Sequence, residues 1–112
     1  MVVTREVVLT VTLNTGQTAY VFDQCPVEGK ITQVIREWPD GSNHLLDIAI
    51  GHEGIWMLPN LTDVYVALND ATTVIQVNEK INRGEKLWAR FRNRDAFWPH
   101  TPTVTFVVEG EP

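Results

Sequence analysis

The strongest constraint on the fold is a two-residue alternation of hydrophobic and polar positions that turn residues interrupt again and again. In residues 6–13, the aliphatic side chains of Val7, Leu9, Val11 and Leu13 occupy every second position. Successive side chains of a strand point to opposite faces, so this period predicts a half-buried β-strand. The Asn-Thr-Gly-Gln run that follows supplies turn residues, because Asn and Gly accept the backbone angles of tight reversals.

The same pattern recurs along the chain, with turn signals about every 8–12 residues, which is typical of a sandwich or barrel. It predicts nine strands, over residues 6–13, 18–23, 30–38, 45–50, 55–58, 63–68, 73–77, 84–93 and 103–108. Strict alternation fails within the third, which indicates a bulge or a strand buried on both faces. We expect an all-β, antiparallel sandwich of eight or nine short strands, jelly-roll-like, with an immunoglobulin-like sandwich as the second choice.

The chain of 112 residues has the size of one domain. Residues 1–5 are expected to form a flexible N-terminal arm and residues 6–112 the sandwich. Val2 and Val3 of this arm are candidates for adding a strand to the sheet edge of a neighbouring molecule. The start of the chain lacks the pattern of a signal peptide, and no apolar run approaches the ~20 residues of a membrane span. Cytoplasmic synthesis without membrane contact is therefore expected.

Basic residues are concentrated near the C-terminal end, where strands 84–93 and 103–108 are expected to form a hairpin around loop 94–102. Residues 80–95 hold six basic and two acidic residues, a net charge of +4, whereas the rest of the chain holds three and twelve, a net charge of −9. This separation favours docking on an acidic partner or on another copy of the chain. The overall charge of −5 argues against nucleic-acid binding.

No catalytic or metal-binding motif is recognisable. His44 and His52 bracket the fourth strand eight positions apart, and at ~3.3 Å per residue they lie too far apart to share a metal ion. The lone Cys25 and the lone Ser42 lie in turns without a partner base. Asp47 is the one acid in the middle of a hydrophobic strand, which does not make a carboxylate pair. We expect a protein that is not an enzyme and that has no cofactor.

Four tryptophans are the most informative excess. If Leu87 and Phe91 face the core, Trp88 comes to the outer face beside two arginines. Exposed aromatic and arginine side chains are typical of interface hot spots. The candidate partner-binding residues are Trp88, Arg90, Arg92, Phe97, Trp98 and His100. Two alternatives stay open: coplanar, exposed tryptophans that stack on sugar rings, or a Trp88 that the chain itself covers.

A family resemblance rests on the turn and strand patterning of most of the chain. The segments that carry it are residues 26–31 (PVEGKI), 38–41 (WPDG), 51–54 (GHEG), 98–101 (WPHT) and 103–105 (TVT). In these the chain resembles small jelly-roll virion proteins of tailed phages, such as capsid decoration proteins. The resemblance implies a structural subunit on a virion surface, a homo-oligomer such as a trimer, with a major capsid or tail protein as partner. The alternative function is a carbohydrate-binding or adhesion module.

Overall fold

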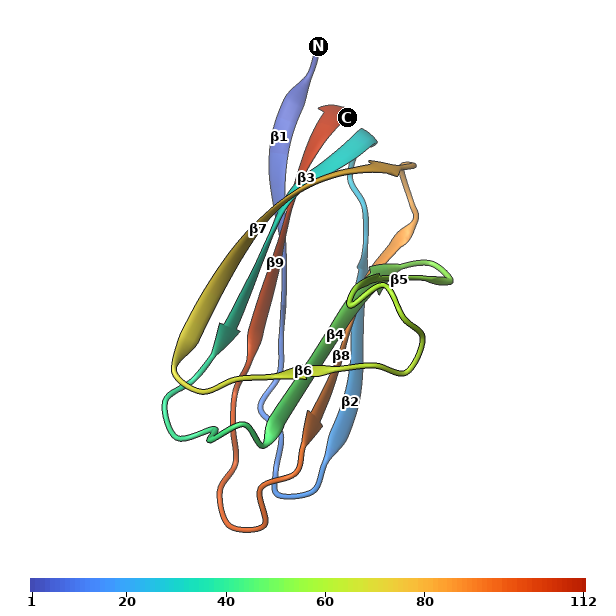
Figure 1. Ribbon diagram of the computed structural model, residues 1–112. Coiled ribbons are helices and arrows are strands. Elements are labelled where there is room, and N and C mark those ends of the chain that lie inside the picture. The colour runs from blue at the N-terminus through green and yellow to red at the C-terminus, as the bar shows by residue number, and fades with distance from the viewer.

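The computed structural model describes residues 1–112 and consists of strands, turns and loops (Figure 1). The strands are β1 (Val3–Thr10), β2 (Thr18–Gln24), β3 (Glu28–Trp38), β4 (Leu46–His52), β5 (Ile55–Leu58), β6 (Val66–Ala67), β7 (Ala71–Ile81), β8 (Lys86–Asn93) and β9 (Thr103–Glu111). The structure contains no helix that is long and apolar enough to span a membrane. The all-β prediction is confirmed.

The strands form two antiparallel sheets with the topology of a jelly roll. One sheet has the order β1-β9-β3-β7 and the other β2-β8-β4-β5, with the short β6 paired to β4. The pairs are nested, β1 with β9, β2 with β8, β3 with β7 and β4 with β5. The chain is thus arranged like one long hairpin whose successive strand pairs fall alternately in the first and the second sheet. This is the jelly-roll arrangement.

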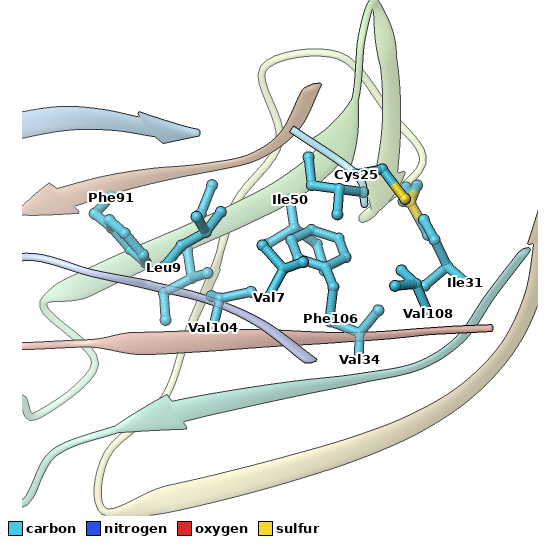
Figure 2. Close-up of a cluster of buried hydrophobic side chains, with 14 of the residues drawn as sticks. Val7, Leu9, Cys25, Ile31, Val34, Ile50, Phe91, Val104, Phe106 and Val108 are labelled. Carbon is cyan, nitrogen blue, oxygen red and sulfur yellow. The ribbon is translucent and has the colours of Figure 1, made fainter. Parts of the chain in front are cut away.

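The core lies between the two sheets and receives every second side chain of each strand. Nineteen buried hydrophobic residues form one cluster. Figure 2 shows Phe106 and Val34 from one sheet opposite Ile50 and Phe91 from the other. Because the strands alternate, the side chains between these positions point outward and form the two outer faces of the sandwich.

Two local predictions of the strand pattern are confirmed or refined. The irregular third strand carries a bulge against β9, where Thr32 is the extra residue between Ile31 and Gln33. At the same place the register against β7 also shifts, but there the extra residue lies on β7. Trp38 ends this strand, as expected from the proline that follows it. Its indole is nevertheless part of the core, since Trp38 is only 2% exposed. The indole Nε1 donates a hydrogen bond to the Leu46 carbonyl oxygen at 2.9 Å.

The expected C-terminal hairpin is wrong. Strand β8 pairs with β2 and β4, whereas β9 pairs with β1 and β3, so loop 94–102 crosses from one sheet to the other. The expected free arm over residues 1–5 is also wrong from Val3 onward, because Val3 opposite Gly110 already begins the β1–β9 ladder. Conversely, the predicted strand over residues 63–68 shrinks to the two residues of β6. Local alternation does not reveal which distant strand supplies the hydrogen bonds.

Two phenylalanines provide a matched test of where the core lies. Replacing the buried Phe106 with Ala removes a core ring and should lower the free energy of unfolding by about 3–5 kcal/mol. The same change at Phe97, 81% exposed, should stay within about 0.5 kcal/mol of the parent protein. Urea denaturation followed by tryptophan fluorescence measures both, and equal losses would contradict this assignment of the core.

Candidate docking site

The predicted outer face of β8 is confirmed, but the predicted exposure of Trp88 is wrong. Trp88 points away from the core cluster and is still only 2% exposed. Its ring meets Trp56 edge-to-face, with centroids 5.0 Å apart, and its Nε1 donates to the Glu53 carbonyl oxygen at 2.7 Å. Strand β5 therefore covers Trp88, which is the alternative that the sequence left open. A substitution of Trp88 would change the stability of the fold and would not report on partner binding.

A glycine makes this burial possible. Gly51 lies directly opposite Trp88 on β4. A Cβ atom at this position would collide with the Trp88 ring and with the Ile55 carbonyl oxygen. The missing side chain leaves a seat for the indole on the outer face of the sheet.

The arginines of β8 are largely occupied within the chain. The Arg90 guanidinium lies 4.8 Å from the Tyr20 ring centroid, 5.3 Å from that of Trp56 and 5.2 Å from that of Trp88. Such cation–π contacts stabilise the face and hold the arginine in place. Its buried Nε atom has no hydrogen-bond partner. Arg90 thus acts mainly as a support between aromatic side chains.

Asp47 neutralises part of the positive charge of residues 80–95. This carboxylate is 4% exposed and pairs with Arg92 at 2.6 Å and with Arg94 at 2.8 Å. Arg92 also lies over the Tyr65 ring at 4.4 Å. The hydrogen bonds that Arg94 donates to Asp47 raise the pKa of Arg94 above its ordinary value. Most arginine side chains of the outer face are therefore paired within the chain, with aromatic rings or with Asp47. Tyr20 and Phe22 remain half exposed at the margin of this face.

The loop between β8 and β9, which we call the aromatic tip, presents two large aromatic side chains to solvent. Phe97 is 81% and Trp98 67% exposed. The tip lies at the foot of the molecule in Figure 1, at the opposite end from the chain termini. The molecule is elongated, with extents of 48 × 23 × 21 Å. The termini and the tip therefore cannot belong to one site, and Val2 and Val3 are separated from Phe97 and Trp98.

A buried carboxylate organises the tip. Asp95 Oδ1 accepts hydrogen bonds from the backbone amides of Phe97 at 2.9 Å and Trp98 at 3.3 Å. Its Oδ2 lies 2.9 Å from His100 Nε2. The amide of Phe97 and the imidazole of His100, with a smaller contribution from Trp98, hold the pKa of Asp95 below its ordinary value. The two exposed side chains are therefore held on a fixed backbone.

His100 supports the tip and is not itself presented to a partner. It is 7% exposed, which contradicts its predicted place in a contact surface. Its backbone forms an antiparallel bridge with Leu13, with N–O distances of 2.8 and 3.0 Å. Asn93 adds a second brace, donating from Nδ2 to the Trp98 carbonyl oxygen at 3.0 Å. The sequence-based prediction missed Asn93 and Asp95, although an Asn and an Asp just after a strand are a turn signal.

A shallow hollow of about 390 Å³ opens beside the tip. Its lining joins the tip to the turn between β3 and β4. The residues around it are Asp40, Gly41, Asn43, Trp98, Pro99 and His100. The hollow thus offers an exposed indole next to a carboxylate and an amide.

The remaining candidate groups serve the fold. Burial raises the pKa of the Cys25 thiol, which donates to the Val27 carbonyl oxygen at 3.3 Å. Ser42 donates to the Leu68 carbonyl oxygen at 3.0 Å. His52 Nδ1 lies 2.8 Å from a Glu85 carboxylate oxygen. No three His, Cys, Asp or Glu side chains come together in a group that could hold a metal ion.

Comparison with known proteins supports the fold alone. No family model matches the chain, and no curated protein matches it. The crystal structure of FlhE superposes with a TM-score of 0.55 at 14% sequence identity, covering 99% of this chain and 98% of that one. A family two carbohydrate esterase from Cellvibrio japonicus gives a TM-score of 0.46 at 15% identity, and only 34% of its chain is covered. That second likeness is too low to carry an argument.

The role of Asp95 leads to a prediction about pH. Because its pKa is lowered in the folded state, Asp95 stabilises the protein above the ordinary aspartate pKa of about 4, and this contribution is lost as pH falls through the lower, folded value. Asp95→Asn should lower Tm at pH 7, and its deficit should narrow as the pH falls below about 4. Thermal denaturation across this range measures the deficit.

Glu37→Gln is the matched control, since Glu37 is exposed on β3 and makes no side-chain hydrogen bond or ion pair. Its Tm should follow that of the parent protein at every pH. An Asp95→Asn variant with the parent Tm at pH 7 would show that the charge of Asp95 does not support the tip.

Proposed function

We propose that this chain is a non-enzymatic assembly module that docks on a protein partner through the aromatic tip. The exposure of Phe97 and Trp98 on a braced loop carries the proposal. Large aromatic side chains that are exposed to water do not stabilise the fold. Their burial against a partner contributes favourable free energy to binding, because apolar surface is removed from water. Because the backbone of the tip is already ordered, little conformational entropy is lost on binding.

The charges beside the tip specify the kind of partner. Arg92 and Arg94 are about half exposed, with side-chain exposures of 45% and 46%, although Asp47 pairs with both. Arginine at the rim of an aromatic contact is typical of protein interfaces. We expect a partner with an apolar pocket for Phe97 and Trp98 and with acidic groups around it.

A virion surface is the setting that the sequence resemblance implies, with a major capsid or tail protein as the partner. The jelly-roll topology is compatible with this setting, because it is common in viral capsid domains and equally in lectin domains. Fold therefore does not choose between a protein and a sugar as ligand. The choice rests on the tip and its surroundings.

Binding of a sugar is the second candidate, and the hollow beside Trp98 favours it. An exposed indole with a neighbouring carboxylate and amide can stack on a pyranose ring and bond its hydroxyl groups. The four tryptophans do not form the coplanar, exposed set that a sugar-binding face requires, because Trp38 and Trp88 are each 2% exposed. Moreover, a sugar in the hollow gives Phe97 no role.

Site-specific photocrosslinking in the cells that produce the protein tests docking. A benzophenone amino acid at position 97 should yield one discrete protein adduct. Trp98→Ala should reduce its yield at least tenfold, because hot-spot aromatics contribute about 2 kcal/mol or more. The control places the same crosslinker at Ile55, which is 52% exposed on β5. The same adduct from position 55, or no adduct from position 97, would contradict docking through the tip.

The two candidate ligands predict different patterns of substitution. A protein partner requires both Phe97 and Trp98, so Phe97→Ala and Trp98→Ala should each weaken binding. A sugar requires Trp98 and Asp40, so Phe97→Ala should leave binding to a glycan array unchanged while Asp40→Ala abolishes it. Glycan binding with this second pattern would replace the docking function by the carbohydrate-binding one.

A further inference from the structure

Strand β7 is an open edge of the first sheet. Its sole strand partner is β3, and in Figure 1 it runs along the outside of the sheet with no strand beyond it. None of the 13 backbone hydrogen bonds outside the strand ladders involves residues 71–81. In an antiparallel strand with one neighbour, every second residue directs its N–H and C=O groups to the free side. These groups of β7 have no partner within the chain.

The first half of this edge also lacks the usual protection against strand addition. Natural edges are short or carry charges, prolines or bulges that prevent pairing with another chain. Strand β5 has four residues, β1 carries Arg5 and Glu6, and β2 carries Asp23. Strand β7 has eleven residues, and its run 71–76 (ATTVIQ) contains no charge, proline, glycine or bulge. The bulge opposite Thr32, at Val77 and Asn78, and the charged Glu79 and Lys80 are confined to its far end. It is the long edge strand best suited to pairing.

We propose that β7 pairs antiparallel with β7 of a second copy of this chain, about a two-fold axis. A two-fold pair is self-complementary, so the same strand supplies both sides. Each face of the joined sheet stays continuous only if core-facing residues oppose core-facing residues. Pairing with Ile75 opposite Ile75 satisfies this condition, because Ile75 lies opposite the core residue Val34, and it covers a half-buried side chain of each copy.

The charges at the ends of β7 favour this register and a second copy as the occupant. Within its own sheet, Lys80 lies directly opposite Lys30, and like charges in this position repel. Neither Lys80 nor Asp70, the residue just before β7, forms an ion pair within the chain. With Ile75 on the axis, Asp70 of each copy comes near Lys80 of the other at the end of the ladder, beyond the bulge at Val77 and Asn78. The pair thereby gives Lys80 an acidic neighbour on its free side, whereas within its own sheet the nearest acid of this row, Glu109, lies beyond Lys30.

Blocking the edge with lysines tests the pairing. Light scattering after size exclusion, at concentrations up to about 1 mM, should show that the parent protein forms a dimer. Val74→Lys combined with Gln76→Lys should make it monomeric, because these exposed positions oppose each other across the pair and would bring four lysines together. Hydrogen exchange should be slower at alternate amides of residues 71–78 in the parent dimer only.

The matched control is Thr4→Lys combined with Val8→Lys on the edge strand β1, where Val8 is 52% and Val74 54% exposed. It adds the same charge and should leave the dimer intact. A parent protein that stays monomeric overturns the proposal, as does a dimer that the β1 variant disrupts or that the β7 variant leaves unchanged. A monomer that protects the same amides only when another protein is added would assign the edge to a foreign strand.

Lys80→Glu distinguishes the contact between copies from a role in the single chain. It relieves the repulsion from Lys30 and should leave Tm unchanged or raised, yet it places two acids together at each end of the pair. The dimer should weaken by about fivefold, and adding Asp70→Asn should recover most of the loss. A dimer that tightens with Lys80→Glu overturns the register.

This inference does not depend on the tip, because no residue of the tip belongs to β7 or pairs with it. Phe97→Ala and Trp98→Ala should leave the dimer unchanged, and Val74→Lys with Gln76→Lys should leave crosslinking from position 97 unchanged. Each proposal can therefore fail without the other.

Discussion

The arrangement of this molecule depends on how the chain passes between its sheets at the end that bears the tip. Two connections run side by side there, β1 to β2 and β8 to β9, and the bridge between Leu13 and His100 joins them. The Asn93 side chain, 1% exposed, donates to the Leu13, Asn14 and Trp98 carbonyl oxygens. Polar groups buried at this depth are stable only when they are satisfied, so the network specifies one path for both connections.

The same network holds the proposed binding element in one conformation. Exposed aromatic residues on a mobile loop would bind at a high entropic cost. Here Asp95 joins the amides of the tip to His100, and His100 is in turn paired with Leu13. The exposed side chains are thus attached, through a few hydrogen bonds, to the ladders of both sheets. A preorganised contact of this kind is what a docking element requires.

Local pattern in the sequence was enough to predict the fold class, but not the partners of each strand. Alternation correctly assigned the core side of β8, with Leu87 and Phe91 inward, because side-chain direction is a local property. It could not show that Trp56 covers Trp88, since that contact depends on the register between β4 and β5 and on the space left by Gly51. The expected hairpin failed for the same reason: which strands pair is decided by nonlocal packing. The tip aromatics were predicted as candidates, whereas the burial of His100 follows from its bridge across the sandwich.

The two proposals together define a geometry of assembly. The strands run along the long axis of the molecule, with the tip at one end (Figure 1). Two copies joined through antiparallel β7 strands would direct their tips in opposite directions. Such a dimer connects two partners instead of covering one surface, unlike a trimer whose subunits all face a shell with the same end. If β7 pairs as proposed, the chain acts as a two-ended link, and a decoration subunit that lies flat on a capsid is the less suitable description.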